Sequence, residues 1–389
     1  MRVAIFSRYP RDVNQPRGGV ESVTVSLVRS LARLDGLDIH VVTLEKDLAD
    51  VLVERHDGAA VHRLPASRWP QMLDILGGPG RRRLVDYILD LHPDVVHAHE
   101  THGLMLGGLP LPFVFTVHGF DHANLEAEGD LAARVRSPLW RMVEKYGLSH
   151  QHSIISITPY VRRMIEPLTG ARIHDIDNPV DYRFFETSRD EQPGRVFFAG
   201  WITERKNPLG VLEAFARVRR RGIEATVAIA GEAREQEYRD RLLACIEREK
   251  LADRVEFLGH VRHDRLPAEL ARSALFVLPS RQENSPMAIA EAMAVGVPVI
   301  ASNRCGMPFM IREGESGYLI EPDDHDEIAD RMARILTDCA LRARMGQVGR
   351  SIAMERFHPD TVARKTVEVY RTLIDSGKGG VRSRVEGAN

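Results

Sequence analysis

The chain alternates from one end to the other between short β-branched runs and longer amphipathic stretches. Several short runs are apolar throughout, which is typical of strands buried on both faces of a parallel sheet. The stretches between them repeat apolar residues at helical spacing. This alternation predicts a doubly wound α/β fold. Because 389 residues exceed one ordinary core, we expect two such domains.

The expected elements are spread over both halves of the chain. In the first half we expect strands at Arg2–Ser7, Asp38–Leu44, Ala59–Leu64, Asp94–His99, Phe113–His118 and Ser153–Thr158. In the second half we expect them at Arg195–Ala199, Ala225–Ala230, Val255–Leu258, Leu275–Pro279 and Val297–Ala301. Helices are expected at Gly19–Leu34, Pro208–Arg221, Glu235–Lys250 and Pro286–Val295.

The predicted domains are residues 1–178 and residues 195–357, joined by a linker at residues 179–194. The linker region contains an Asn-Pro pair and the polar run T-S-R-D-E-Q-P-G, without strong periodicity. A closing helix is predicted over residues 358–376, because H-P-D is a typical helix start. The polar, glycine-rich tail at residues 377–389 is expected to be disordered.

The composition excludes several classes of protein. A formal net charge of −2 provides no general attraction to nucleic acid, so no nucleic-acid partner is expected. The fractions of hydrophobic residues (43%) and charged residues (28%) are typical of globular proteins. The three cysteines are odd in number and widely spaced, which indicates reduced thiols. No stretch approaches the ~18 apolar residues of a spanning helix, and we expect a soluble, cytoplasmic protein.

The segment E-N-S-P-M-A-I-A-E follows a predicted strand and opens a predicted helix. Ser285 is a good N-cap and Pro286 is favoured at the first helical position. Gly296 and Pro298 should end the helix. Ligands of open α/β sheets bind at this edge of the sheet, and anions favour helix N-termini.

Four residues of this segment are candidate ligand contacts. The N–H groups near Met287 and Ala288 could hold a phosphate. Glu283 would project from the loop, while Glu291 would reach the opposite end of the ligand. A ligand with hydroxyls at both ends and a diphosphate between them suits this spacing. The alternative is a capped helix with two solvated glutamates.

Two adjacent cations, Arg205 and Lys206, lie in the loop A-G-W-I-T-E-R-K-N-P between another predicted strand and helix. Two cations there could neutralise a diphosphate and stabilise it as a leaving group. The alternative is a pair of exposed surface cations.

Paired glycines, Gly18 and Gly19, lie between the first predicted strand and helix. Such glycines allow a phosphate to approach the backbone closely. The sequence is not G-x-G-x-x-G, so a dinucleotide site is disfavoured. A plain tight turn explains the two glycines equally well.

Histidine is dense between residues 92 and 122. His97 and His99 share one face of a predicted strand, and His118 ends the next strand with Asp121 close behind. His99, His118 and Asp121 are candidate polar groups in a cleft between domains, whereas a structural role is expected for His97. No metal site is expected, because no Cys or spaced His/carboxylate set completes a known pattern.

Basic residues of the first half form a further candidate surface: Arg81–Arg83, Arg134, Arg136 and Arg141. Such a cluster could face an acidic membrane, which would place the protein at the inner face of the membrane. Solvated helix faces explain these residues equally well.

These motifs together resemble the retaining glycosyltransferases of GT-B architecture, specifically glycosyltransferase family 4 (glycosyl transferases group 1). The likeness runs from G-G-V-E through D-V-V-H-A-H-E and T-V-H-G-F-D to E-N-S-P-M-A-I-A-E-A-M-A-V-G-V-P-V-I-A-S. The last segment matches the family's E-x7-E signature. The resemblance implies two Rossmann-like domains whose parallel sheets face a central cleft, with the acceptor held by the first domain and the donor by the second.

The resemblance also implies an activity. A sugar would pass, with retention, from a UDP- or GDP-linked donor to a hydroxyl of a glycan, lipid-linked or small-molecule acceptor. No metal or other cofactor is implied, and the oligomeric state stays open. The helix at residues 358–376 resembles the family's segment that crosses back to the first domain. Alternatives are an epimerase or phosphorylase on the same fold, or a non-catalytic sugar-nucleotide-binding subunit.

By the same resemblance, Glu283 would bind hydroxyls of the donor sugar and Glu291 the nucleotide ribose. Arg205 and Lys206 would hold the diphosphate, assisted by Gly18, Gly19 and the helix N-terminus at Ser285, Pro286, Met287 and Ala288. His118 would lie beside the reacting carbon, and His99 and Asp121 on the acceptor side. Trp201 departs from the family pattern, since many members carry an Arg there.

Overall fold

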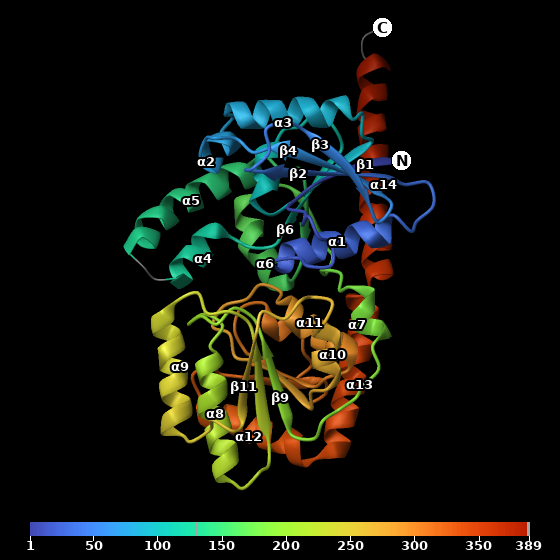
Figure 1. The fold of residues 1–389 in the computed structure, drawn as a ribbon. Coiled ribbons are helices and arrows are strands. Elements are labelled where there is room, and N and C mark those ends of the chain that lie inside the picture. Colours follow the sequence, from blue (N-terminus) through green and yellow to red (C-terminus); the bar gives the residue numbers. More distant parts are fainter. Residues whose placement is uncertain (129–130, 387–389) are drawn as a thin grey trace. The chain divides into compact units, whose positions relative to one another are not determined.

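The structure of the protein is a computed structural model that describes residues 1–128 and 131–386. It divides the chain into two compact units, drawn in Figure 1. The N-terminal unit comprises Met1–Pro179 together with the chain from Pro359 onward, and the C-terminal unit comprises Val180–His358. Each unit has its own sheet and core and is described by itself.

The N-terminal unit is built on one mostly parallel sheet. Its strands are β1 (Arg2–Phe6), β2 (Asp38–Glu45), β3 (Leu52–His56), β4 (Ala59–Pro65), β5 (Val95–His99), β6 (Phe113–Val117), β7 (Ser153–Ser156) and β8 (Arg172–Asp175). Their order is β3-β4-β2-β1-β5-β6-β7-β8, and only β3 runs antiparallel to its neighbour. The chain adds β2 on one side of β1 and later adds β5 on the other side. The direction of winding therefore changes between β1 and β5.

Helices cover both faces of this sheet, and β1 shows why. Val3 and Ile5 belong to one hydrophobic cluster, whereas Ala4 and Phe6 belong to another. Since successive side chains of a strand point to opposite faces, a continuously apolar strand requires helices packed on both faces of the sheet. The helices are α1 (Gly19–Leu31), α2 (Gln71–Ile75), α3 (Pro79–Asp90), α4 (Asp121–Glu128), α5 (Leu131–Ser149), α6 (Pro159–Ile165) and α14 (Pro359–Glu386), with 3-10 helices at Glu100–Leu106 and Glu166–Leu168.

The last helix, α14, belongs to the N-terminal unit, where it packs beside α1 (Figure 1). Tyr370 of α14 is fully buried in the cluster that contains Val3 and Ile5. Helix α14 continues to Glu386, beyond the predicted end at residue 376. The predicted disorder of residues 377–389 stays a prediction, and residues 387–389 lie outside the described residues.

The C-terminal unit contains an all-parallel sheet. Its strands are β9 (Arg195–Ala199), β10 (Thr226–Ala230), β11 (Val255–Gly259), β12 (Leu275–Leu278), β13 (Val299–Ser302) and β14 (Gly317–Ile320). Their order, β11-β10-β9-β12-β13-β14, is the 3-2-1-4-5-6 order of a Rossmann sheet. The helices are α7 (Tyr182–Glu186), α8 (Pro208–Arg220), α9 (Gln236–Arg248), α10 (Leu266–Ala271), α11 (Met287–Val295), α12 (His325–Thr337) and α13 (Cys339–Arg356), with a 3-10 helix at Met307–Phe309.

The predicted linker at residues 179–194 is part of the C-terminal unit instead. It contains α7, whose Phe184 and Phe185 are buried in the core of that unit. Asp181 caps this helix by accepting a hydrogen bond from the backbone N–H of Arg183 at 3.0 Å. Sequence periodicity did not reveal α7 because one and a half turns are too short to show it.

The prediction of two doubly wound α/β domains is confirmed, but several elements were not predicted. Strands β3, β8 and β14 are short, and the first two have polar or exposed residues at most positions. Helix α11 begins at Met287 and has Pro286 rather than Ser285 at its N-cap, one residue later than predicted. No helix within residues 1–128 and 131–386 is both long and apolar enough to cross a membrane.

Candidate functional site

The C-terminal unit places the candidate donor residues at the switch point of its sheet. Strands β9 and β12 are neighbours, yet their crossovers run to opposite sides of the sheet. The loop after β9 carries Arg205 and Lys206, and the loop after β12 carries Glu283. Carboxyl ends of parallel strands meet at one edge, and a switch point there leaves a crevice suited to ligands.

Close backbone packing fixes the loop that follows β9. Gly200 has φ +154°, a conformation that disfavours other residues, and a Cβ on Gly231 would lie only 1.9 Å from the carbonyl oxygen of Gly200. At the end of the loop, buried Asn207 adopts the left-handed conformation and caps α8. Its side chain accepts from the N–H of Gly210 at 3.1 Å and donates to the carbonyl oxygen of Pro322 at 2.8 Å. The two cations therefore precede a fixed helix start.

Glu283 is the point where the predicted site residues meet. Its Oε1 atom accepts from Nη1 of Arg205 and pairs with Nζ of Lys206, each at 2.6 Å. Arg205 also donates to the carbonyl oxygen of Gln282 at 2.9 Å. All three charged side chains are mostly buried. The structure thus brings Arg205 and Lys206, which are predicted to hold the diphosphate, into contact with Glu283, which is predicted to bind the donor sugar.

A glycine that the sequence analysis missed holds the loop of Glu283 in place. The N–H of Gly306 donates to the carbonyl oxygen of Glu283 at 2.8 Å. A Cβ on Gly306 would lie 1.7 Å from the carbonyl oxygen of Asn284, so only glycine fits here. Gly306 follows β13, the next strand of the sheet. A glycine soon after a predicted strand was the available signal.

The N-terminus of α11 lies directly after this loop. Pro286 is buried at the N-cap, whereas Met287 and Ala288 are partly exposed. The first N–H groups of a helix lack intrahelical acceptors and carry the positive end of its dipole. An anion between this helix start and Lys206 would therefore meet favourable potential from both.

Glu291 is buried in α11 and belongs to a network that the sequence analysis did not predict. Its Oε1 atom lies 3.3 Å from Nε2 of His263, and Nδ1 of His263 lies 3.4 Å from the guanidinium of Arg183. Arg183 forms a two-pronged ion pair with Asp181, at 2.9 and 3.0 Å. A charged side chain buried this deeply requires such partners, and the network sets the direction of Glu291.

Trp201, which departs from the family pattern, has a cation stacked on it. The guanidinium carbon of Arg234 lies 4.4 Å from the centroid of the Trp201 ring. Trp201 is 36% exposed, and the neighbouring Ile202 bridges to Ala233. Arg234 therefore brings a positive charge beside the loop position where an arginine was expected. This cation lies on a loop after β10 and had no signal in the sequence.

In the N-terminal unit, Gly18 and Gly19 lie at the start of α1, after the first strand and next to the switch between β1 and β5. A Cβ on Gly18 would meet no atom within 4 Å, so open space adjoins this turn. The backbone N–H of Arg17 donates to a carboxylate oxygen of Glu21 at 2.7 Å. The turn is therefore held by its own helix and leaves room beside the glycines.

Three of the histidines form a connected group at the carboxyl ends of β5 and β6. Nδ1 of His97 lies 2.6 Å from the hydroxyl of Tyr370, and its Nε2 lies 2.7 Å from the hydroxyl of Thr116. Nδ1 of His99 lies 2.9 Å from Nε2 of His118, and the two rings are stacked. The predicted structural role of His97 agrees with these buried contacts. His99 orients the His118 ring.

Asp121 begins α4, and its backbone N–H donates to Glu144 of α5 at 2.6 Å. Glu144 is buried and also pairs with His122. The predicted acceptor-side residue is thus fixed through its backbone by a carboxylate that the sequence analysis did not single out. In the described part of the chain, no group of three or more His, Cys, Asp or Glu is arranged to hold a metal ion.

Burial holds the histidine group in its neutral form. It lowers the pKa of His97 to about 3 and the pKa values of His102 and His118 to about 4. Unfolded histidine titrates near about 6.5, so the unfolded chain binds more protons between these values. We expect these histidines to contribute stability above pH ~6.5 that is lost as the pH falls toward ~4. Burial raises the pKa of Glu100 and of Glu144, which acts in the opposite direction.

The measurement is the melting temperature of the protein at a series of pH values from about 7.5 to 5. Because the glutamates oppose the histidines, the informative quantity is the change of this pH slope on substitution. His97→Gln should flatten the slope, whereas His260→Gln, at an exposed position, should leave it unchanged. Equal slopes for all three proteins would show that His97 is not held neutral.

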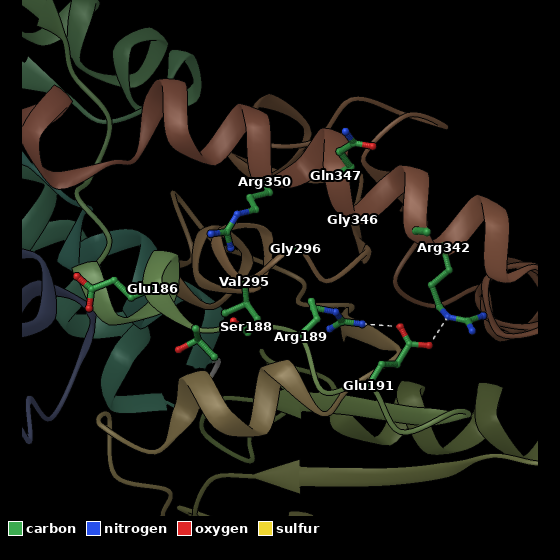
Figure 2. A pocket seen from close by; sticks show the side chains of 12 residues that line it. Glu186, Ser188, Arg189, Glu191, Val295, Gly296, Arg342, Gly346, Gln347 and Arg350 are labelled. Atoms are coloured by element: carbon green, nitrogen blue, oxygen red, sulfur yellow. Dashed lines mark hydrogen bonds and ion pairs between the residues drawn. The ribbon is translucent and has the colours of Figure 1, made fainter.

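A groove of about 660 Å³ lies elsewhere in the C-terminal unit (Figure 2). It reaches Gly296 at the carboxyl end of α11, roughly 13 Å along the helix from its N-terminus. Glu191 pairs with Arg189 at 2.6 Å and with Arg342 at 2.7 Å, as Figure 2 shows. Arg350 donates to the carbonyl oxygen of Ala294 at 2.7 Å. The positive end of the helix dipole, which favours a diphosphate, lies at the other end of α11, so we do not assign the donor to this groove.

Two family models match consecutive parts of the chain. Residues 17–184 match Glycosyltransferase Family 4, and residues 181–352 match Glycosyl transferases group 1. The phosphatidyl-myo-inositol mannosyltransferase of Mycolicibacterium smegmatis is 29% identical, with 100% of this chain and 97% of that protein covered. The glycogen synthase of Mycobacterium tuberculosis is 28% identical, with 72% of this chain and 68% of that protein covered.

Solved structures show the same fold at lower identity. A sucrose-phosphate synthase from Thermosynechococcus elongatus superposes with a TM-score of 0.75 at 21% identity, covering 96% of this chain and 99% of the other. Anabaena Alr3699/HepE in complex with UDP and glucose superposes with a TM-score of 0.70 at 18% identity, covering 94% and 98%. With both family models matched in sequence and the fold shared with such enzymes, the chain belongs to glycosyltransferase family 4 and is a glycosyltransferase of the GT-B fold.

Proposed function

We propose that this glycosyltransferase transfers a sugar from a UDP- or GDP-linked donor to an acceptor hydroxyl with retention of configuration. The observation that supports this most directly is the contact of Glu283 with both Arg205 and Lys206, at the switch point and next to the N-terminus of α11. A diphosphate requires two or more positive groups converging on one place. Few sites on an α/β sheet supply side-chain cations and a helix start together.

Donor binding would exchange one set of ion pairs for another. Without donor, the carboxylate of Glu283 neutralises both cations, so no buried charge is left alone. A diphosphate has more negative charge and more acceptor oxygens than one carboxylate, so it would draw Lys206 and Arg205 to itself. Glu283 would then be released to accept hydrogen bonds from the hydroxyls of the donor sugar.

The other candidate residues would contact the ribose end and the sugar end of the donor. Glu291, directed by His263, would accept hydrogen bonds from the ribose hydroxyls. His118 would lie near the reacting carbon as a neutral imidazole, because burial lowers its pKa to about 4. A neutral ring can donate or accept a hydrogen bond without placing a positive charge beside a cationic transition state. Gly18 and Gly19 would border the phosphates, and His99 and Asp121 the acceptor.

Retention requires the acceptor hydroxyl to attack the reacting sugar carbon from the same face as the one from which the diphosphate departs. The leaving phosphate oxygen would take the acceptor proton, so no side chain need act as general base. Arg205 and Lys206 would stabilise the departing diphosphate, a large electrostatic contribution to such a reaction. These cations supply the charge that a metal supplies elsewhere, so the proposal includes no metal or other cofactor.

The test is a thermal-shift screen of UDP-, GDP- and ADP-sugars, followed by turnover of the stabilising donor with candidate acceptors. A bound donor raises the melting temperature by mass action. Nuclear magnetic resonance of the product then gives its anomeric configuration, and an α product from an α donor supports retention. An inverted product would overturn retention. Conversion of the donor without an acceptor would indicate an epimerase, and donor binding without turnover would indicate a binding subunit.

A further inference from the structure

One face of α5 exposes a stripe of large apolar side chains. Val135, Leu139, Met142 and Tyr146 are 75%, 50%, 70% and 47% exposed. They are spaced four, three and four residues apart, so they lie on one side of the helix. The opposite side carries Leu148, which is buried in the core of the N-terminal unit, and Trp140, which packs against that core. The stripe is therefore a second apolar face that the fold of this unit does not use.

A smaller apolar patch lies on a neighbouring element. Trp69, Leu73 and Leu76 in and around α2 are also exposed, and they repeat the same spacing of four and three residues. Helix α2 contacts α5 in the N-terminal unit, where Figure 1 shows the two helices as neighbours. We call the stripe of α5 and the patch of α2 together the α5–α2 face. Single exposed apolar residues are ordinary, but a set of seven on two adjoining helices is not.

Basic side chains border the stripe. At 100° per residue, Lys145 lies about 60° from one edge of the stripe and Arg136 about 60° from the other, with Arg141 farther round on the side of Lys145. All three are exposed, and Arg141 also pairs with Glu126. Helix α3, which contacts α2, adds exposed Arg82 and Arg83. The border that α5 supplies is positive, whereas α3 also exposes Asp86 and Asp90, and the whole chain has a net charge of −2.

The structure changes the basic set that the sequence analysis proposed. Arg81 donates to the carbonyl oxygens of Met105 and Gly107 at 2.6 and 2.7 Å, so it serves the fold rather than a partner. The side chain of Arg134 lies outside the described residues. The exposed set is Arg82, Arg83, Arg136 and Arg141, to which Lys145 is added. More importantly, the apolar stripe between these cations was not predicted.

We propose that the α5–α2 face docks on a bilayer that contains anionic phospholipids. An apolar helix stripe with basic borders buries its side chains at the boundary of headgroups and acyl chains while its cations meet acidic headgroups. A second copy of this chain fits less well, because a two-fold contact through this face would bring like charges together. Docking would hold the N-terminal unit at the surface from which a lipid-linked acceptor can be taken.

The test is co-sedimentation of the full-length protein with vesicles of phosphatidylcholine alone, or with about one third phosphatidylglycerol. We expect binding to the anionic vesicles only, weakened by added salt because the headgroup attraction is screened. Leu139→Ser/Met142→Ser should lower the vesicle partition coefficient about tenfold or more. Arg136→Gln/Lys145→Gln should lower it by a similar factor, since each cation near an acidic surface contributes a factor of about five.

Met354→Ser is the matched control, because Met354 is an exposed apolar residue on α13 of the other unit. It should bind vesicles as the unchanged protein does. Circular dichroism and melting temperature identify any variant that fails to fold, and the charge variant tests the same face without altering an apolar residue. Absence of binding to anionic vesicles, or binding unchanged in both double variants, would overturn the proposal. A dimer in light scattering that both double variants abolish would overturn it in favour of a second copy.

Discussion

Lys206→Ala should lower the turnover number by ~10²-fold or more, because a lost charge contact to the leaving group in a desolvated site is worth a few kcal/mol. In the structure Lys206 is mostly buried, with Nζ at 2.6 Å from Glu283. It is therefore already positioned next to the carboxylate whose place a diphosphate would take. Steady-state kinetics with the donor found by thermal shift measure the effect. The KM for the donor should rise less than the turnover number falls, because the charge on the leaving oxygen develops in the transition state.

The control for this variant is Lys46→Ala, which removes an exposed lysine from the N-terminal unit. Removing Lys206 also leaves Glu283 paired with Arg205, so the melting temperature should be measured alongside. A folded Lys206→Ala protein that turns over at the original rate would exclude the assigned role.

Glu291→Gln should weaken donor binding roughly 10- to 100-fold, since a hydrogen bond to a charged group contributes about 1.5–3 kcal/mol. Glutamine keeps the shape of the side chain and replaces one acceptor oxygen by a donor nitrogen. That nitrogen would confront ribose hydroxyls, and Oε1 of Glu291 already lies 3.3 Å from His263. Isothermal titration calorimetry with the donor and with the free nucleotide measures the loss.

Both ligands should lose affinity to a similar extent, because the proposed contact is to the ribose that they share. Glu249→Gln is the matched change at a helix end of the same unit, where Glu249 pairs with Arg220 and Arg248. It should leave the affinity unchanged. Equal donor affinity in the Glu291→Gln protein and the unchanged protein would remove Glu291 from the site.

Elements that were predictable from the sequence are continuous apolar runs or repeats of helical period. Strand β1 and helix α8 are examples, because an apolar run or a 3.6-residue repeat extends over the whole element. Helix α7 has five residues, and a 3.6-residue period is not visible over so few positions. For this reason its residues were predicted to be part of a linker.

The candidate site was predictable where residues are adjacent in sequence or mark a helix start. Arg205, Lys206 and Glu283 meet because the strands before them are neighbours in the sheet, and strand order follows from winding rules. His263, Gly306 and Arg234 were missed because their importance depends on contacts across the fold. His263 is recognisable only from its contact with Glu291, and Gly306 only from the 1.7 Å that a Cβ would leave to Asn284.

Helix α14 has a consequence for how the chain folds during synthesis. The C-terminal unit is continuous, so all of its parts exist once His358 has been made. The first strand of the N-terminal unit begins at Arg2. Tyr370, the last fully buried residue of its core, lies on α14 near the other end of the chain. At about 5–20 residues per second, translation of the intervening unit takes roughly ten to forty seconds. Throughout that interval Val3 and Ile5 lack the part of their apolar cover that α14 provides, so the unit that begins first is completed last.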